Sequence, residues 1–252
     1  MQKKRRLIII LSFMLFPVTM NYLSPYIPMD AAMQGIIAGS LITFACLFLA
    51  ALFTGRAWCG WLCPIAGLSD VCLRVSEKPA DAAKLRRIRR VIGFAWASLV
   101  VLFFVLAGGM KGFNPLYYTD TGVSVDSPYK FVIYYGIIAA FLIVTLKAGK
   151  RGGCHSICWM TLFLESGRAL GRKLGLPQCR IKASGPLCVG CGSCNKACPM
   201  GVAVSHEVGG GYIFSKDCIF CGECVDACRK NALAFSFERA AQEKMRERQE
   251  VL

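Results

Sequence analysis

The chain contains 252 residues, of which 55% are hydrophobic and 15 are cysteines, and its formal net charge at pH 7 is +15. This length allows two modest domains. The apolar residues are concentrated before residue 147, and short apolar patches alternate with glycine, cysteine and charge after it. Because the basic residues are wedged between apolar runs, nucleic-acid binding is a poor explanation of the charge, and no nucleic-acid partner is expected.

Four runs in the first half contain no charged residue: residues 7–23, 33–53, 91–110 and 131–146. About 20 helical residues, rising ~1.5 Å each, cross a hydrocarbon core of ~30 Å. The second and third runs reach that length. The first and last are short, but flanking tyrosines can extend both as interfacial anchors, and Pro17 is expected to kink the first. The sequence therefore predicts a membrane α-helical domain, with four transmembrane helices, in residues 1–180.

Basic residues set the expected orientation of this domain. The opening "MQKKRRLIII" resembles the start of a secretory signal, but no convincing cleavage site follows Leu23, which favours an uncleaved first helix. Lysine and arginine are abundant before the first run and between the second and third runs, whereas the other two loops hold only Lys111 and Lys130. Since cationic loops stay in the cytoplasm, both termini are predicted to be inside, with the charge serving orientation and anionic-lipid contact.

The helical half contains an internal repeat at a shift of 95 positions. The shift superimposes the second apolar run on the fourth. It also pairs Arg56 with Arg151, Cys59 with Cys154, Cys63 with Cys158 and Asp70 with Glu165. The sequence thus predicts two repeated helical hairpins, each ending on the cytoplasmic side in R-x-x-C-x-x-x-C.

The C-terminal half repeats at a shift of 30, which aligns "CVGCGSCNKACPMGVAV" with "CIFCGECVDACRKNALAF". The spacing C-x-x-C-x-x-C-x-x-x-C is typical of bacterial two-cluster ferredoxins, in which three thiolates bind one [4Fe-4S] cluster and the fourth crosses to the other. Residues 181–237 are therefore predicted to form an α+β ferredoxin domain with two [4Fe-4S] clusters, followed by a charged helical tail at residues 238–252. The predicted ligands are Cys188, Cys191, Cys194 and Cys228 for one cluster, and Cys218, Cys221, Cys224 and Cys198 for the second.

Zinc and disulfides are the competing interpretations of these eight cysteines. Structural zinc usually takes two separated cysteine pairs, and three thiols within seven residues followed by a fourth is unusual for it. Disulfides are disfavoured because the predicted topology places the domain in a reducing cytoplasm. Iron-sulfur clusters are the preferred interpretation.

The paired cysteines of the helical half leave three interpretations open. If the two hairpins pack as a pseudo-twofold pair, four thiolates are brought together, enough to bind a further iron-sulfur centre or another thiophilic metal. These thiolates belong to Cys59, Cys63, Cys154 and Cys158. They also suit two redox-active dithiols, one per repeat. Plain packing at helix ends is the third interpretation, and it is the one favoured for Cys46 in mid-helix. The metal centre is preferred because each cysteine pair follows an arginine at the same spacing.

The stretch "GRAWCGWLCP", the second C-x-x-x-C and the double ferredoxin together resemble the NapH-type membrane polyferredoxins of bacterial respiration. The resemblance covers essentially the whole chain, and the order of its parts is specific to that group though not to one member. Two positions depart from the pattern, since Trp159 and Arg229 each stand where a proline is expected. The large periplasmic domain of the nitrous oxide branch is missing, which argues against that assignment.

The resemblance implies a function and a location. The chain would be an electron-transfer subunit in the inner (cytoplasmic) membrane of a bacterium, with its N-terminus and ferredoxin domain in the cytoplasm. It would pass electrons between the quinone pool and its clusters, oxidising quinol in a respiratory complex with another iron-sulfur or cytochrome subunit. The alternative is a maturation or regulatory factor that reduces a metal or metallocentre of a partner protein. No nucleotide motif and no nucleophile with a recognisable base stands in the sequence, so no catalytic residue is assigned.

Residues beside the paired thiols are candidates for the quinone site: Trp58, Trp61, His155 and Trp159. A histidine can take a proton from a quinol, because its pKa range suits that role. An aromatic belt at the lipid interface explains the tryptophans as well as a quinone pocket does, and a solvated surface position would explain the histidine.

Overall fold

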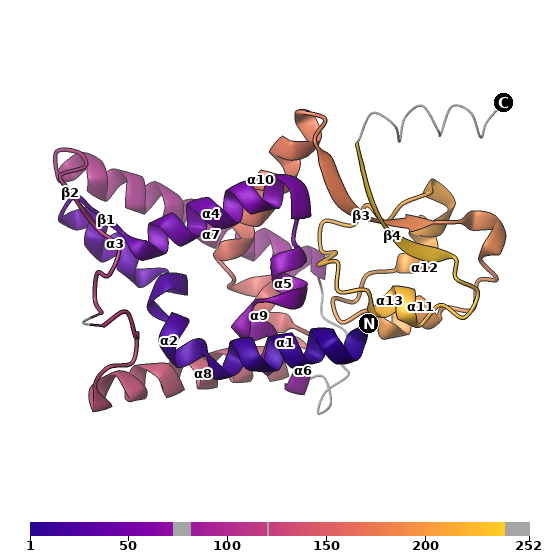
Figure 1. Ribbon diagram of the computed structural model, residues 1–252, viewed down its shortest axis with the longest axis horizontal. Coiled ribbons are helices and arrows are strands. Elements are labelled where there is room, and N and C mark those ends of the chain that lie inside the picture. The colour runs from indigo at the N-terminus through magenta and orange to yellow at the C-terminus, as the bar shows by residue number, and fades with distance from the viewer. Residues whose placement is uncertain (73–81, 120, 240–252) are drawn as a thin grey trace.

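The computed structural model of the protein describes residues 1–72, 82–119 and 121–239. Figure 1 shows an elongated molecule with a helical part at one end and a cysteine-rich part at the other, and the N-terminus lies at the junction between them. The predicted helical tail falls outside the described residues except for its first two positions, which belong to strand β4 (Leu233–Arg239).

Most of the helical part consists of short and long helices joined by tight turns. In chain order its elements are α1 (Gln2–Met14), α2 (Phe16–Thr19), η1 (Asn21–Leu23), α3 (Tyr26–Met33), β1 (Ile36–Ala38), α4 (Gly39–Thr54), α5 (Ala57–Trp61), α6 (Pro64–Cys72), α7 (Ala82–Leu106), β2 (Gly112–Asn114), α8 (Pro128–Ala148), α9 (Gly152–Ser156) and α10 (Met160–Lys173). The first helix breaks at Leu15, directly before the turn that contains Pro17, which confirms the predicted kink. Strands β1 and β2 pair in parallel at the end of the molecule farthest from the cysteine-rich part (Figure 1).

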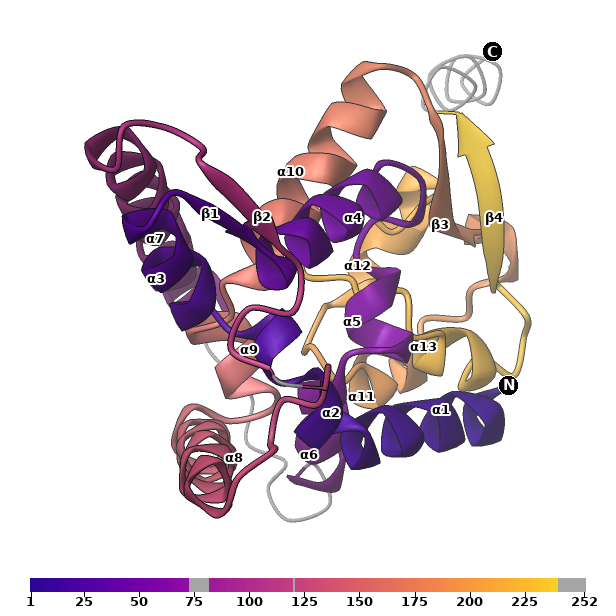
Figure 2. The same ribbon diagram turned by 60° about the vertical axis from the view of Figure 1, so that its left-hand side comes forward.

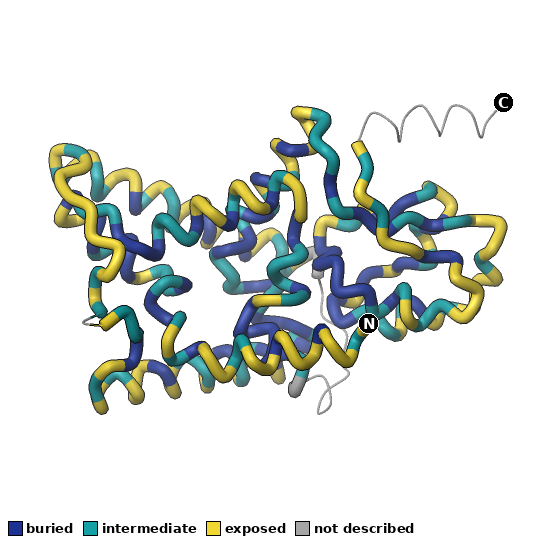
Figure 3. The backbone as a smooth tube through the Cα atoms, viewed as in Figure 1, coloured by how far each residue is buried: buried dark blue, intermediate teal, exposed yellow. Residues whose placement is uncertain are grey.

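Helices α7 and α8 are long and apolar enough to cross a bilayer. Only 22% and 17% of their most apolar stretches are buried, so their hydrophobic side chains face outward, unlike those of a core helix in a water-soluble protein. In Figure 3 many residues along these helices are coloured as exposed, and buried residues are concentrated near the junction with the cysteine-rich part. The chain is therefore a membrane protein. Helices α4 and α1, with 16 and 13 residues, are shorter than the expected span, and four transmembrane helices remain a prediction.

The repeat in the helical part is confirmed by the backbone. Helix α5 (Ala57–Trp61) and helix α9 (Gly152–Ser156) begin and end at positions that differ by 95 residues. Each follows a long helix, contains the first cysteine of its pair, and is followed by the second cysteine just before α6 or α10. Figure 2 shows both short helices at the centre of the molecule, surrounded by α1, α4, α7 and α8.

Helices α4 and α10 pack with close approach of their backbones. Gly167 and Gly171, four residues apart on α10, face the carbonyl oxygens of Phe48 and Leu52 on α4. A Cβ atom at Gly171 would lie 2.3 Å from the Leu52 oxygen, so only glycine fits. Small residues at this spacing allow such packing between membrane helices.

The cysteine-rich part is a small α+β unit built on one antiparallel pair of strands. Its elements before β4 are β3 (Pro177–Ala183), η2 (Gly185–Leu187), α11 (Ser193–Ala197), α12 (Val204–Glu207), η3 (Val208–Gly210) and α13 (Glu223–Asp226). Strands β3 and β4 pair from Pro177 opposite Arg239 to Ala183 opposite Leu233, so the predicted boundary at residue 180 falls inside β3. The two cysteine motifs follow the same backbone path, because positive φ angles recur 30 positions apart at Gly190 and Phe220, Gly192 and Gly222, and Gly201 and Asn231.

Replacing Gly171 with alanine tests the packing of α4 on α10. The new methyl group has no room beside the Leu52 oxygen, so we expect Gly171→Ala to lower the thermal midpoint in detergent, by about 1–3 kcal/mol of unfolding free energy. Gly136→Ala is the matched control, because nothing lies within 4 Å of the position its Cβ would take. Equal midpoints for the two variants would contradict the close packing.

Candidate functional site

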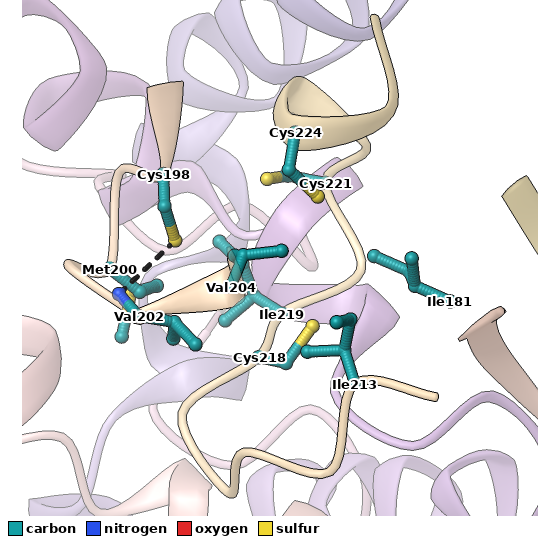
Figure 4. A pocket seen from close by; sticks show the side chains of 10 residues that line it. All are labelled: Ile181, Cys198, Met200, Val202, Val204, Ile213, Cys218, Ile219, Cys221 and Cys224. Atoms are coloured by element: carbon teal, nitrogen blue, oxygen red, sulfur yellow. Dashed lines mark hydrogen bonds between the residues drawn. The ribbon is translucent and has the colours of Figure 1, made fainter. Parts of the chain in front are cut away.

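Four thiols surround one small cavity in the cysteine-rich part. They belong to Cys198, Cys218, Cys221 and Cys224, here called the proximal four. The rest of the lining is apolar, and Figure 4 shows the four sulfur atoms around the same space. Three come from the second motif and one crosses from the first, which is the combination predicted for one cluster.

Backbone amides donate to the crossing sulfur atoms. The Val202 N–H donates to Cys198 Sγ at 3.4 Å, and the Ala232 N–H donates to Cys228 Sγ at 3.3 Å, 30 positions later. Burial raises the pKa of Cys218 to about 12, so a thiolate there would require a positive partner such as a metal. Four convergent thiols, an apolar wall and amide donors to sulfur fit a [4Fe-4S] cluster.

The remaining four ferredoxin cysteines, here called the distal four, lie nearer the surface. Burial raises the pKa of Cys194, and negative charge at Cys188 and Cys191 raises it further, so these three thiols are neighbours. Hydrogen bonds from Ser193 lower the pKa of Cys191, and Arg229, the residue after Cys228, adds to the effect. Cys191 is exposed, whereas Cys218, Cys221 and Cys224 are buried. The distal four thus include one solvent-exposed thiol, at Cys191, whereas none of the proximal four is exposed.

The paired cysteines of the two repeats meet at a second, much larger cavity of about 730 Å³. Its walls include all four of Cys59, Cys63, Cys154 and Cys158, here called the membrane four. The cavity runs from these thiols past Phe16 and Ile137 to Tyr129 and Lys130, in the first turn of α8. Within the described part of the chain, no three Cys, His, Asp or Glu side chains converge on a point that one metal ion could occupy.

Buried arginines join the two repeats reciprocally. Arg56 and Arg151, which the repeat equates, are 1% and 0% exposed. Arg151 of the second repeat pairs with Asp70 of the first, and Arg56 of the first lies 3.5 Å from Glu165 of the second. Each repeat therefore supplies a cation to the carboxylate of the other, as buried charges require.

Two further arginines extend these pairs to the cysteine-rich part. Arg5 of α1 lies 3.3 Å from Asp70 and 2.7 Å from Glu223. Arg89 of α7 lies 2.5 Å from Glu165 and 3.5 Å from Asp217. The result is two corresponding groups, here called the two clamps. One clamp consists of Arg5, Arg151, Asp70 and Glu223, and the other of Arg89, Arg56, Glu165 and Asp217.

The clamps hold the proximal four against the membrane four. Asp217 and Glu223 directly precede Cys218 and Cys224 in the chain. Cys59 packs against the hydrophobic core of the cysteine-rich part. The two thiol sites thus lie on either side of one charged junction.

Backbone contacts close the same junction. A Cβ atom at Gly60 would lie 2.4 Å from the Ile219 oxygen, so α5 and the second cysteine motif touch directly. The Trp61 indole N–H donates to the Phe220 carbonyl at 2.9 Å, and the Gln2 side chain donates to the Cys221 carbonyl at 3.0 Å. Arg168 stacks over the Phe220 ring, 5.1 Å from its centre. The segment that carries three of the proximal four is therefore held by many contacts.

The four quinone candidates occupy different places. Only Trp159 lines the large cavity, and its indole N–H donates to the Leu23 carbonyl. Trp61 donates a hydrogen bond across the junction. Trp58 packs in the helical core, and its indole nitrogen has no hydrogen-bond partner among the described residues. His155 is fully buried, with Nδ1 3.9 Å from an Asp217 oxygen and no ring hydrogen bond to the described residues, so it is not a solvated surface residue. Burial lowers the pKa of His155 to about 4, with Arg56 and Arg89 adding to the effect, so its ring is neutral at pH 7.

Sequence reasoning missed half of the residues in the two clamps. It found Arg56, Arg151, Asp70 and Glu165 as repeated positions, but counted Arg5 and Arg89 only as charges that set orientation. A signal was present, because Asp217 and Glu223 each stand next to a predicted cluster ligand in a chain with 15 acidic residues against 30 basic ones. Acidic residues that are scarce and adjacent to ligands are candidates for ion pairs.

Comparisons with known proteins support these sites. Residues 187–233 match a 4Fe-4S dicluster domain, and residues 37–88 and 131–177 each match a 4Fe-4S binding domain. The latter two matches contain the two C-x-x-x-C motifs, and the former contains both ferredoxin motifs. No solved structure gives a significant match to the chain.

Several curated proteins are similar along most of the chain. An uncharacterized protein of Methanocaldococcus jannaschii is 25% identical over 202 residues, covering 79% of this chain and 72% of its own. The ferredoxin-type protein NapH of Haemophilus influenzae is 25% identical over 198 residues, covering 74% of this chain and 64% of its own. The methylamine utilization ferredoxin-type protein MauN of Methylobacillus flagellatus is 25% identical over 180 residues, covering 69% and 60%. The matched region is thus less than two thirds of NapH and of MauN.

Removing one carboxylate tests the clamps. In Asp70→Asn, Arg151 and Arg5 lose a charged partner while Arg151 stays buried, so we expect a loss of about 3–5 kcal/mol in unfolding free energy. Asp126→Asn is the control, since its partner Lys130 is 24% exposed and can turn to water, whereas Arg151 is inaccessible, so this change should cost about 1 kcal/mol or less. Thermal unfolding in detergent measures both, and similar losses for the two variants would count against the clamps.

Proposed function

Since the chain belongs to the NapH-type family of membrane-bound, ferredoxin-type iron-sulfur proteins, we propose that it oxidises membrane quinol and passes the electrons to a redox partner. Its 4Fe-4S domains and its relatives assign it to iron-sulfur electron transfer. The geometry that supports this function is the order of the three thiol sites, from the helical part through the junction to the ferredoxin part. The membrane four line a large apolar cavity, the proximal four lie across the clamped junction, and the distal four reach the surface at Cys191.

We assign one [4Fe-4S] cluster to the proximal four and one to the distal four. When bound, these clusters supply reversible one-electron oxidation and reduction. The chain contributes the thiols, the amide donors at Val202 and Ala232, and burial of the proximal site. Those are the means by which a protein sets the potential of such a centre.

A third iron-sulfur centre at the membrane four is the interpretation that the geometry favours. Its main support is that thiols from both repeats line one cavity. Two independent dithiols would need neighbours only within each motif, and plain packing would not place four sulfur atoms around a space of this size. The reciprocal pairs of Arg56 with Glu165 and of Arg151 with Asp70 hold the two motifs together.

The same cavity suits a quinone. Its volume of about 730 Å³ lies within the range of small-molecule sites, which are mostly apolar with a few placed polar groups. Thr161 lines it with a buried hydroxyl that has no hydrogen-bond partner in the described part of the chain, and this hydroxyl can donate to a quinone oxygen. Trp159 and Phe141 supply aromatic wall beside the membrane four. A quinol bound there would stand next to the proposed centre.

A redox partner is expected at the distal four. Cys191 is exposed there, and so are the apolar side chains of Leu187 and Val189. Lys196, Arg229 and Lys230 are exposed around the same motifs and give this surface a positive charge. A partner subunit with an acidic surface is complementary to it.

Iron content tests the third centre. Anaerobically purified protein should contain about twelve irons per chain, falling to about eight in Cys59→Ser, because one four-iron centre loses a ligand. Cys46→Ser is the control, since Cys46 is exposed on α4 and lines neither cavity. Eight irons in all three proteins would remove the third centre and leave the two ferredoxin clusters.

Quinol kinetics test the cavity. In Thr161→Val the hydroxyl is lost at nearly constant volume, so quinol should bind about 3- to 10-fold more weakly, the effect of about one hydrogen bond. The measurement is the rate of cluster reduction by quinol, followed optically at increasing quinol concentration. Thr54→Val is the control, because its hydroxyl is exposed and bonds its own helix. An unchanged concentration dependence in Thr161→Val would argue against quinone in this cavity.

A further inference from the structure

A second hollow, lined by arginines, lies on the outer surface of α7. Its lining consists of Arg86, Arg87, Arg90, Val91, Phe94 and Ala95. The hollow has a volume of about 590 Å³ and is separate from the cavities that contain the thiols. It takes no part in the proposed electron path.

The arginines on this face differ from the clamp arginine on the same helix. Arg89 points inward and is fully paired with Glu165 and Asp217. Arg87 and Arg90 are exposed, and neither forms an ion pair with a carboxylate of the described residues. Arg86 pairs with Asp217 through one terminal nitrogen, and its buried Nε has no hydrogen-bond partner among the described residues. The hollow therefore presents donors without acceptors.

The face changes from cationic to apolar along the helix axis. Arg87, Arg90, Val91 and Phe94 are spaced three and four residues apart, so they share one side of α7. Val91 and Phe94 are 64% and 60% exposed. The helix becomes one of the two candidate membrane spans from Lys84 onward, which places the arginines at headgroup level and the apolar residues against acyl chains.

We propose that this hollow binds the phosphate headgroup of an anionic phospholipid. Guanidinium groups bind phosphate through paired hydrogen bonds, and basic pockets at the ends of membrane helices recognise acidic lipid headgroups. The adjoining apolar stripe contacts the lipid's acyl chain. A free phosphate or an acidic protein segment would use the arginines but would leave Val91 and Phe94 exposed.

The site is joined to the redox junction through one side chain. Arg86 contacts Asp217 at 2.5 Å, and Asp217 directly precedes Cys218 of the proximal four. A phosphate bonded to the accessible part of the Arg86 guanidinium would fix this side chain in its paired position. Bound lipid is therefore expected to stabilise the clamp that contains Asp217.

Lipid binding to the full-length protein tests the proposal. In native mass spectrometry from detergent, phosphatidylglycerol should bind the wild-type protein in preference to phosphatidylcholine. The double variant Arg87→Gln/Arg90→Gln leaves the Arg86–Asp217 pair intact and should bind phosphatidylglycerol about 30-fold more weakly, since each arginine contributes about 1 kcal/mol. Lys3→Gln/Lys4→Gln removes the same charge from exposed positions on α1 and should bind as the wild type does.

Each contrary result overturns the proposal. Equal weakening by the lysine and arginine variants would mean a diffuse attraction of the whole basic surface. Thermal stabilisation of the wild type by inorganic phosphate to the same extent as by phosphatidylglycerol would mean a free-anion site. Equal binding of the two lipids by the wild type, which depends on no variant folding correctly, would remove the site altogether.

Discussion

The structure depends on buried arginine–carboxylate pairs at the junction of its two parts. Four nearly inaccessible guanidinium groups lie there, and a buried charge is tolerated only when it is paired and hydrogen-bonded. Each carboxylate partner is consequently held in place. Because Asp217 and Glu223 each stand one residue before a proximal thiol, the pairing fixes the ferredoxin part against the helical part with the thiol sites facing each other. An electron carrier needs fixed and short distances between centres, which a rigid junction provides.

The two clamps extend the repeat beyond what the amino-acid pattern shows. Arg5 and Arg89 lie on α1 and α7, the first helix of each hairpin, and neither the shift of 95 nor the shift of 30 relates them. They correspond only in space, through their contacts with Asp70 and Glu165. The reciprocal pairing of the two repeats therefore extends to the ferredoxin part, which meets one clamp through Glu223 and the other through Asp217.

Local spacing predicted much of this protein, and long-range packing accounts for the rest. Residues close in sequence determine the cysteine motifs, the helix break just before Pro17 and the matched helices α5 and α9. The basic residues were used only to predict the membrane orientation, so the burial of Arg5, Arg56 and Arg89 was not predicted. Hydropathy likewise cannot show that His155 is enclosed or that Trp61 bonds across the junction, because both depend on a segment 60 or more residues away.

The central claim is that the proximal and membrane thiol sites hold centres close enough to exchange electrons across the clamped junction. Spin-relaxation EPR of the anaerobically reduced protein tests this claim most directly, since two paramagnetic centres at short distance shorten each other's relaxation. The account predicts coupling between a ferredoxin cluster and a membrane centre in the wild type, and weaker coupling in Arg151→Gln. Well-resolved spectra of non-interacting centres in the wild-type protein would contradict it.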